Sequence, residues 1–200
     1  MVDKYSAADS YTDPDTGVLI NKLGLLTQDE IDEAEAALVS VAIAELVFEP
    51  LMVGEGGPGL DFLCDIHRKL FGDLYEWAGE FRTVDISKGS TRFANVRFIE
   101  AEGERLMNSL ASENWLCGLP HDEFADRAAF YMGELNTLHP FREGNGRALR
   151  EYIRHIAARA GHSLSWEGLD RDEMTEAAIS AYKLDHQKMR LVLLKQMTCC

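Results

Sequence analysis

The sequence has no apolar run long enough to cross a membrane. A transmembrane helix needs about 20 consecutive apolar residues, and no window of this chain reaches that length. The first residues, MVDKYSAADS, also lack the apolar core of a secretion signal. We therefore expect a cytoplasmic protein.

Positive charge is scarce. Lys and Arg number 20 against 34 Asp and Glu, so the formal net charge is −14. Non-specific binding to nucleic acid needs a basic surface, because neutralised phosphates supply its affinity, and docking on anionic lipid needs the same. The composition argues against both roles but leaves room for a local positive pocket.

Cysteine is sparse and unpaired. Cys64, Cys117, Cys199 and Cys200 form no CxxC pair and have no zinc-ligand spacing, so no disulfide framework is implied. We expect Cys64 and Cys117 to be ordinary buried thiols, and Cys199 and Cys200 to lie in a frayed chain end. Internal repeats and low-complexity tracts are also absent from the sequence.

What is present is mainly helical periodicity. The length of 200 residues suits one domain with a substantial core. A capping box, with Thr27 followed three residues later by Glu30, predicts a helix that runs to about residue 46. Residues 1–20 are polar and are expected to form a partly ordered arm before a domain at 21–197. Further helices are expected at residues 60–71, 100–112, 120–138, 146–161, about 170–182 and about 185–197.

One segment alternates with the period of a strand. Residues 81–86 (FRTVDI) have this pattern. Residues 87–91 resemble a turn, and residues 92–98 are expected to return as a second strand. The predicted fold class is therefore all-α, a helical bundle with one β-hairpin at about residues 81–98.

The densest chemistry lies in residues 139–150, HPFREGNGRALR. The Gly144-Asn145-Gly146 turn opens a helix, where unpaired backbone N–H groups and the helix dipole favour an anion, usually a phosphate. Arg147 and Arg150 lie on one face of the first turn and can hold the same phosphate chain. The stretch therefore predicts a phosphate site.

His139 and Glu143 add chemistry to this anion site. A histidine can act as a general base near neutral pH. A carboxylate beside phosphates would repel them unless Mg²⁺ lies between, because Mg²⁺ binds carboxylate and phosphate oxygens together. Base, metal ligand, anion turn and arginines together predict a transferase that acts on a nucleotide.

Each residue also has a plainer interpretation. A lone histidine is often structural, a glutamate in a first turn complements the helix dipole, and Asn145 can be a simple turn former. The arginines can be solvated helix residues, and a lysine such as Lys88 is common at a hairpin tip. The remaining histidines show no convergent metal spacing. The combination within one short stretch is what favours the functional interpretation.

Residues 139–150 resemble the signature of the Fic family, His-Pro-Phe-x-(Asp/Glu)-Gly-Asn-Gly-(Arg/Lys)-x-x-Arg, at every fixed position. TDPDTGVLINKLGL is similar to the N-terminal segment of bacterial Fic proteins, and GEFRTVDISKGSTRFANVRFIE is similar to their flap hairpin. The resemblance covers about residues 11–195 and implies the Fic fold.

The resemblance implies protein adenylylation, the transfer of AMP from ATP to a Ser, Thr or Tyr hydroxyl of a target protein. It implies that His139 takes the hydroxyl proton and that Glu143 holds Mg²⁺ on the α- and β-phosphates. A flap at residues 86–94 would pair with an extended target segment by strand addition. The implied nucleotide contacts are the anion hole, the motif arginines and the flap tip: Gly144, Asn145 on the α-phosphate, Gly146, Arg147 and Arg150 on the β- and γ-phosphates, Lys88 and Gly89.

Other branches of the family define the alternatives. Doc-type relatives, which use ATP as a phosphate donor, carry lysine where this chain has Arg147, so the resemblance favours adenylylation. The motif alone does not separate relatives that use UTP or another phosphate-linked donor. The alternative from another class is a catalytically silent module that binds a nucleotide or a partner.

Many Fic proteins carry an inhibitory helix, Ser/Thr-x-x-x-Glu-(Gly/Asn), whose glutamate pairs with the second motif arginine. Residues 163–168 (SLSWEG) match this spelling, with Glu167 as the glutamate, but they directly follow the motif helix inside the fold. We therefore expect the inhibitory helix to lie on a separate small antitoxin, with this chain as the toxin. By analogy with related toxins, the B subunits of type II topoisomerases are a candidate target.

Overall fold

The structure is a computed structural model that describes residues 9–198. Residues 1–8 of the expected arm, and Cys199 and Cys200 with their expected fraying, lie outside this range. Seven α-helices make up most of the described chain: α1 (Gln28–Phe48), α2 (Leu60–Phe71), α3 (Ile99–Ser112), α4 (His121–Leu138), α5 (Asn145–Arg159), α6 (Arg171–Tyr182) and α7 (Gln187–Gln196). The short elements between them are β1 (Ser87–Lys88), β2 (Thr91–Arg92), β3 (Ser163–Leu164), β4 (Met197–Thr198), and the 3-10 turns η1 (Val96–Phe98) and η2 (Asn114–Leu116).

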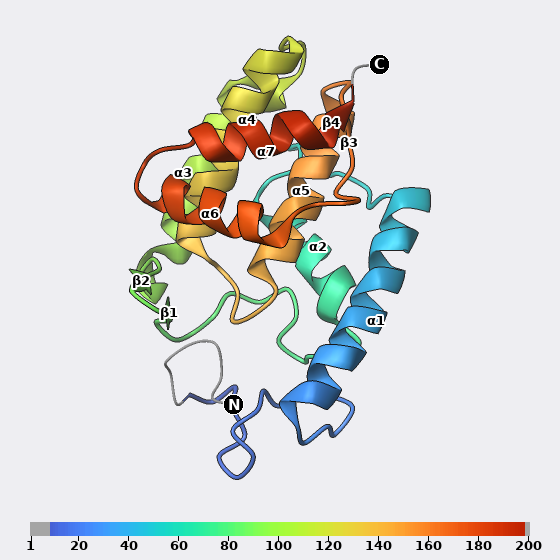
Figure 1. The fold of residues 1–200 in the computed structure, drawn as a ribbon, viewed down its shortest axis with the longest axis vertical. Helices are drawn as coiled ribbons and strands as arrows, with labels where there is room; N and C mark the ends of the chain where they lie inside the picture. Colours follow the sequence, from blue (N-terminus) through green and yellow to red (C-terminus); the bar gives the residue numbers. More distant parts are fainter. Residues whose placement is uncertain (1–8, 199–200) are drawn as a thin grey trace.

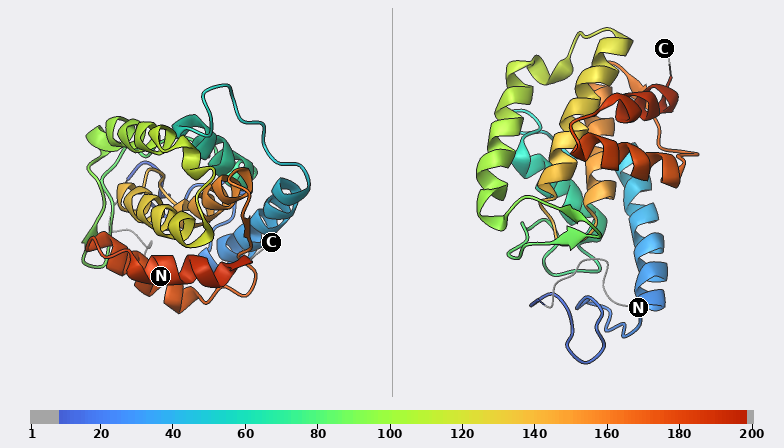
Figure 2. Two further views of the ribbon diagram at one scale, coloured as in Figure 1. Left: turned by 90° about the horizontal axis from the view of Figure 1, so that it is seen from above. Right: turned by 60° about the vertical axis from the view of Figure 1, so that its left-hand side comes forward.

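Helices α4 and α5 form the centre of the bundle (Figures 1 and 2). Helix α3 packs on α4, α2 packs on α5, and α1 packs on α2. Helices α6 and α7 pack against each other and cross α4 on a further face. Ala125, Ala128 and Ala129 of α4 are fully buried, and such short side chains let helices approach closely. This architecture confirms the predicted all-α class.

The helices lie within two residues of their predicted ends, and the start of α1 shows why. Thr27 Oγ1 accepts a hydrogen bond from the Glu30 N–H at 3.3 Å, and Glu30 Oε2 accepts one from the Thr27 N–H at 3.1 Å. The capping box therefore satisfies N–H groups that the first turn leaves without helical partners.

The flap hairpin differs from its prediction. Its strands are only Ser87–Lys88 and Thr91–Arg92, with Ser87 opposite Arg92, and the expected strands at 81–86 and 92–98 are wrong. Backbone groups of those segments bond elsewhere: the Arg82 N–H donates to the Pro140 carbonyl at 2.9 Å, and the Asp85 carboxylate accepts the Val96 N–H at 2.8 Å. The alternating pattern of 81–86 therefore reflects docking against other loops, whereas the predicted β-hairpin itself exists in shortened form.

The described part of the arm packs against the motif loop. Asp9 Oδ2 accepts a hydrogen bond from Arg142 Nε at 2.8 Å, and the side chains are 2% and 0% exposed. Tyr11 lies edge-on to Trp77, with the ring centroids 5.6 Å apart. The arm thus belongs to the same packed body as residues 139–150.

Two sequence expectations concern the cysteine thiols and membrane-spanning helices. Cys64 is buried as predicted, Cys117 is only partly buried, and both are free thiols. In the range that the structure describes, no helix combines the length and the apolar character that crossing a membrane requires.

Candidate active site

The motif lies in the connection between α4 and α5, at the lower ends of both helices (Figure 1). His139 caps α4 in the left-handed conformation, with φ 49° and ψ 62°, and Gly144 caps the start of α5 with φ 79°. Asn145 braces the loop between them: its Oδ1 accepts the Phe141 N–H at 2.8 Å, and its Nδ2 donates to the Phe141 carbonyl at 2.7 Å. The Asn145 side chain therefore stabilises the turn by bonding both backbone groups of Phe141.

Only glycine fits at position 144. Its positive φ is strained for residues with a side chain, and a Cβ there would lie 2.4 Å from the Phe71 ring. The close approach places the turn directly at the N-terminus of α5, where the anion site predicted from the sequence would lie.

His139 has the surroundings of a neutral base. Its Nδ1 lies 3.0 Å from the Asn136 carbonyl, and the Phe93 ring stacks on the imidazole with centroids 3.7 Å apart. Because the carbonyl can only accept, Nδ1 carries the proton and Nε2 carries the lone pair. Burial, with a smaller effect from the charges of Arg82 and Lys88, lowers the pKa of His139 to about 3.

Glu143 and Arg147 form part of a charged network that reaches α1. Arg147 Nη2 lies 2.6 Å from Glu35 Oε1 and 3.7 Å from Glu143 Oε1. The Tyr75 hydroxyl donates to Glu35 Oε2 at 3.1 Å, and the Phe71 ring centroid lies 4.8 Å from the Arg147 guanidinium carbon. Arg147 is thus anchored by a buried carboxylate on another helix.

Glu35 is a residue of this network that the sequence did not predict. It is only 5% exposed, and its carboxylate faces Arg147. The available signal was its position midway between Ile31 and Val39, which are also buried. Residues four apart share a helix face, so a carboxylate in an apolar stripe needs a cation.

Arg150 differs from Arg147 in its charged neighbours. Within residues 9–198 no carboxylate lies in ion-pair distance of its guanidinium, and burial, then the charge of Arg147, lowers its pKa. A Cβ on Gly146 would lie 3.5 Å from Arg150 Nη1, so the guanidinium reaches back to the glycine turn. Glu167 is exposed and makes no ion pair with Arg150 in the described chain.

The flap tip lies on the histidine side of the motif. Lys88 is exposed on β1, and its charge is felt at His139. Gly89 turns the hairpin with φ 58°, and a Cβ there would meet no atom within 4 Å. The structure therefore brings the Lys88 charge near His139 and leaves Gly89 in open space.

His67 is a second buried histidine at the site, and the sequence assigned it only a general surface or core role. Its Nδ1 accepts the Gly79 N–H at 2.9 Å, which leaves Nε2–H to donate to the Glu143 carbonyl, also at 2.9 Å. Its ring stacks on Phe141 with centroids 3.8 Å apart. Burial lowers the pKa of His67 to about 4, so it is a neutral brace of the loop.

The fold and the site define a helical protein in which a glycine turn opens a central helix beside a buried histidine. The chain belongs to the Fic/DOC family, whose model matches residues 59–157. It is 37% identical over 196 residues to the probable protein adenylyltransferase Fic of Salmonella typhimurium, covering 98% of this chain and 96% of that protein.

Two further relatives extend this relationship. The chain is 43% identical over 196 residues to the protein adenylyltransferase VbhT of Bartonella schoenbuchensis, covering 98% of this chain but only 40% of VbhT. The crystal structure of BepC from Bartonella tribocorum with bound AMPPNP superposes with a TM-score of 0.84 at 28% identity, covering 95% of this chain and 97% of that chain.

Proposed function

We propose that this chain is a protein adenylyltransferase that moves AMP from ATP to the hydroxyl group of a serine, threonine or tyrosine on a target protein. The observation that carries the proposal is a neutral, buried His139 beside the glycine turn that opens α5. A base next to an anion site suits the transfer of a phosphate-linked group to a hydroxyl. The Salmonella relative, which has a similar length and bears this activity in its name, supports the same reaction.

His139 Nε2 takes the proton of the target hydroxyl as its oxygen attacks the α-phosphorus. The bond from the α-phosphorus to the bridging oxygen breaks, and pyrophosphate leaves. The turn of Gly144, Asn145 and Gly146 holds the α-phosphate, and Arg147 and Arg150 hold the β- and γ-phosphates. Lys88 and Gly89 cover the nucleotide from the flap, so positioning and charge stabilisation supply most of the rate.

Glu143 is the residue that would hold Mg²⁺ at this site. Residues 9–198 contain no group of three or more His, Cys, Asp or Glu suited to a metal. Mg²⁺ fits a single carboxylate, because it commonly takes its other ligands from phosphate oxygens and water. Bound there, it would neutralise charge that develops on the leaving pyrophosphate.

The partners follow from the same site. A target segment pairs with the flap at residues 86–94, where the partly exposed β1 and β2 strands offer backbone groups for that pairing. Glu167 is exposed and has no ion pair within the described residues, which supports inhibition by a separate small antitoxin rather than by this chain and makes the chain a toxin. We assign residues 21–197 to the catalytic domain and residues 1–20 to its arm. We place the reaction in the cytoplasm. The B subunits of type II topoisomerases are the first target to test.

A donor competition tests this function. The purified chain is incubated with a bacterial lysate, Mg²⁺ and ATP labelled on the α-phosphate, and unlabelled ATP or UTP is added in excess. We expect a labelled protein band that unlabelled ATP removes and UTP leaves. Removal by UTP would show that the site also accepts UTP. ATP binding without any labelled band would contradict transfer from ATP and leave another donor, an inhibited state that involves Glu167, or a silent binding module.

A further inference from the structure

Arg82 lies just before the flap and is fully buried. Its side chain is 0% exposed, and its contact with the Asp85 carboxylate is long, with Nη1 3.9 Å from Oδ1. A buried guanidinium needs hydrogen-bond acceptors for its five N–H groups. At Arg82 backbone carbonyls supply many of them, and they come from three separate segments.

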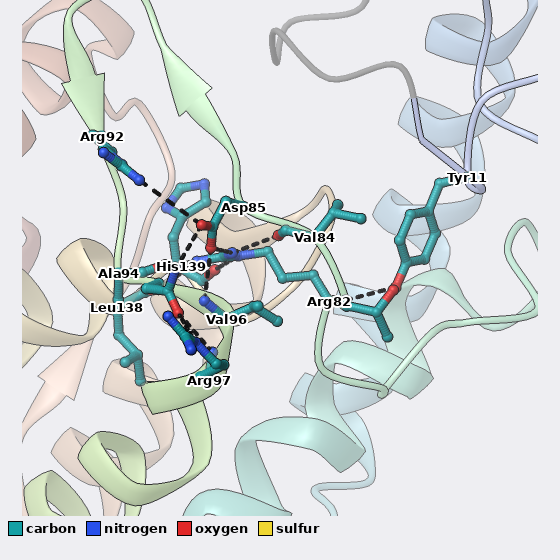
Figure 3. A network of polar contacts seen from close by, with 12 residues as sticks. Tyr11, Arg82, Val84, Asp85, Arg92, Ala94, Val96, Arg97, Leu138 and His139 are labelled. Atoms are coloured by element: carbon teal, nitrogen blue, oxygen red, sulfur yellow. Dashed lines mark hydrogen bonds and ion pairs between the residues drawn. The ribbon is translucent and has the colours of Figure 1, made fainter.

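The three segments are the incoming limb of the flap (residues 82–86), its outgoing limb (residues 92–98) and the end of α4 (Figure 3). On the incoming limb, Nη1 donates to the Val84 carbonyl at 2.6 Å, and on the outgoing limb Nη2 donates to the Ala94 carbonyl at 2.5 Å. At the end of α4, Nε donates to the His139 carbonyl at 2.8 Å and Nη2 approaches the Leu138 carbonyl at 3.4 Å. The Arg82 side chain therefore joins both limbs of the flap to His139, the residue to which we assign the role of general base.

The main chain strengthens this link. The Arg82 N–H donates to the Pro140 carbonyl at 2.9 Å, and the Ala94 N–H donates to the Thr137 carbonyl at 3.2 Å. Both limbs are thus tied to residues 137–140 by backbone as well as side-chain bonds. Removing the guanidinium would leave these backbone bonds in place, so the flap would stay docked but less tightly fixed.

His139 needs such support. Its left-handed conformation, with φ 49°, is unfavourable for a residue other than glycine. The last carbonyls of a helix also lack helical partners and carry the negative end of the dipole. A cation at the Leu138 and His139 carbonyls satisfies both groups and favours the backbone conformation that directs the imidazole into the site.

We propose that Arg82 is a positioning residue that fixes the distance between the flap and His139, so that a hydroxyl held by the flap meets the imidazole. This inference rests on the proposed function, because it assumes that the flap carries the target. Arg82 touches neither substrate in this scheme and acts through the backbone of His139 and of both flap limbs.

The test compares Arg82→Met and Arg82→Lys with Arg105→Met, a matched change of an exposed arginine on α3 whose side chain is 61% exposed. For each variant we would measure kcat and KM for AMP transfer, the affinity for ATP, and backbone hydrogen exchange. We expect Arg82→Met to bind ATP like the unaltered chain but to lose about a hundredfold in kcat, the cost of a misplacement of about 1 Å. Exchange should become faster at 82–98 and 137–142 together and stay unchanged in α7.

Arg82→Lys covers the case in which the methionine variant does not fold. It keeps the charge but offers one compact donor group in place of the fork, so we expect a folded protein with reduced kcat and faster exchange in the same two segments. A wild-type kcat and unaltered exchange in either folded variant would overturn the proposal, as would equal effects in Arg105→Met. If the unaltered chain transfers no AMP, the proposed function fails, and the coupled change in exchange still decides the role of Arg82.

Discussion

The buried Glu35 of α1 and the partly exposed Arg147 of α5 form an ion pair, with Glu35 Oε1 2.6 Å from Arg147 Nη2. The pair joins a helix at the edge of the bundle to the first turn of the motif helix. It fixes the position of Arg147, for which we propose phosphate binding, whereas Arg150 has no such anchor in the described chain. The two motif arginines therefore differ in what they do for stability and for binding.

The first prediction concerns Glu35→Gln. The change leaves the partly buried Arg147 charge beside a neutral amide, so we expect the free energy of unfolding to fall by about 2 kcal/mol. Urea denaturation measures it. The matched control is Glu45→Gln on the same helix, where the pair with Lys69 is exposed and its loss should cost less than about 1 kcal/mol. Equal losses in the two variants would contradict the structural role of Glu35.

The second prediction separates Arg150 from its neighbours. Arg150→Met removes a half-buried cation that has no ion pair within residues 9–198, so the free energy of unfolding should not decrease, and it should rise by up to about 1 kcal/mol. The same change should weaken ATP binding at least about tenfold, because it removes a charge-assisted hydrogen bond worth about 1.5–3 kcal/mol. Calorimetry measures both. Arg159→Met, at an exposed position of the same helix, should change neither, and unaltered ATP affinity in Arg150→Met would refute the role of this arginine.

The third prediction uses the space at Gly144. Gly144→Ala combines a φ of 79° with a Cβ 2.4 Å from the Phe71 ring, so we expect a loss of about 3 kcal/mol in stability and loss of ATP binding. Gly17→Ala is the control, because it has a φ of 72° but no atom within 4 Å of the added Cβ. It should cost about 1 kcal/mol and leave ATP binding intact. The difference between the variants measures the clash.

The fourth prediction concerns acid. Burial lowers the folded-state pKa of His139 to about 3 and of His67 to about 4, whereas an unfolded histidine titrates near 6.5. Between these values the unfolded chain binds protons that the folded chain does not, so stability falls as the pH decreases through this window. Each histidine should cost about 2 kcal/mol between pH 6.5 and pH 5. Urea denaturation of the unaltered chain and of His139→Ala should show a shallower pH dependence in the variant, and equal slopes would contradict the buried neutral imidazole.

The sequence was sufficient for the helices and for the motif because both depend on local signals. Thr27 and Glu30 lie three residues apart and cap α1 by themselves, and Gly144 with Asn145 forms its turn within the loop. Long-range contacts were out of reach of such signals. The ion pair of Asp9 with Arg142 joins residues 133 positions apart, and nothing in the local pattern of either residue indicates the other.

The flap shows how a local pattern can mislead. The alternation in FRTVDI predicted a strand, but Arg82 is buried against backbone carbonyls, and Asp85 accepts hydrogen bonds from the outgoing limb. Arg82 and Asp85 therefore occur at positions that fit a strand pattern, although their side chains stabilise a loop that packs against the end of α4. The burial of Arg82 could be recognised only once the fold was known, because the carbonyls that accept its hydrogen bonds belong to three separate segments.

The most direct test of the central claim compares ATP labelled on the α-phosphate with ATP labelled on the γ-phosphate, using the same lysate, Mg²⁺ and purified chain. His139→Ala is the control, and loss of the general base should slow transfer by about 10²–10⁴-fold. We expect protein label from the α-phosphate only, and its loss in the variant. Label from the γ-phosphate alone would make the chain a kinase, and α-label that persists in His139→Ala would contradict the assignment of the base.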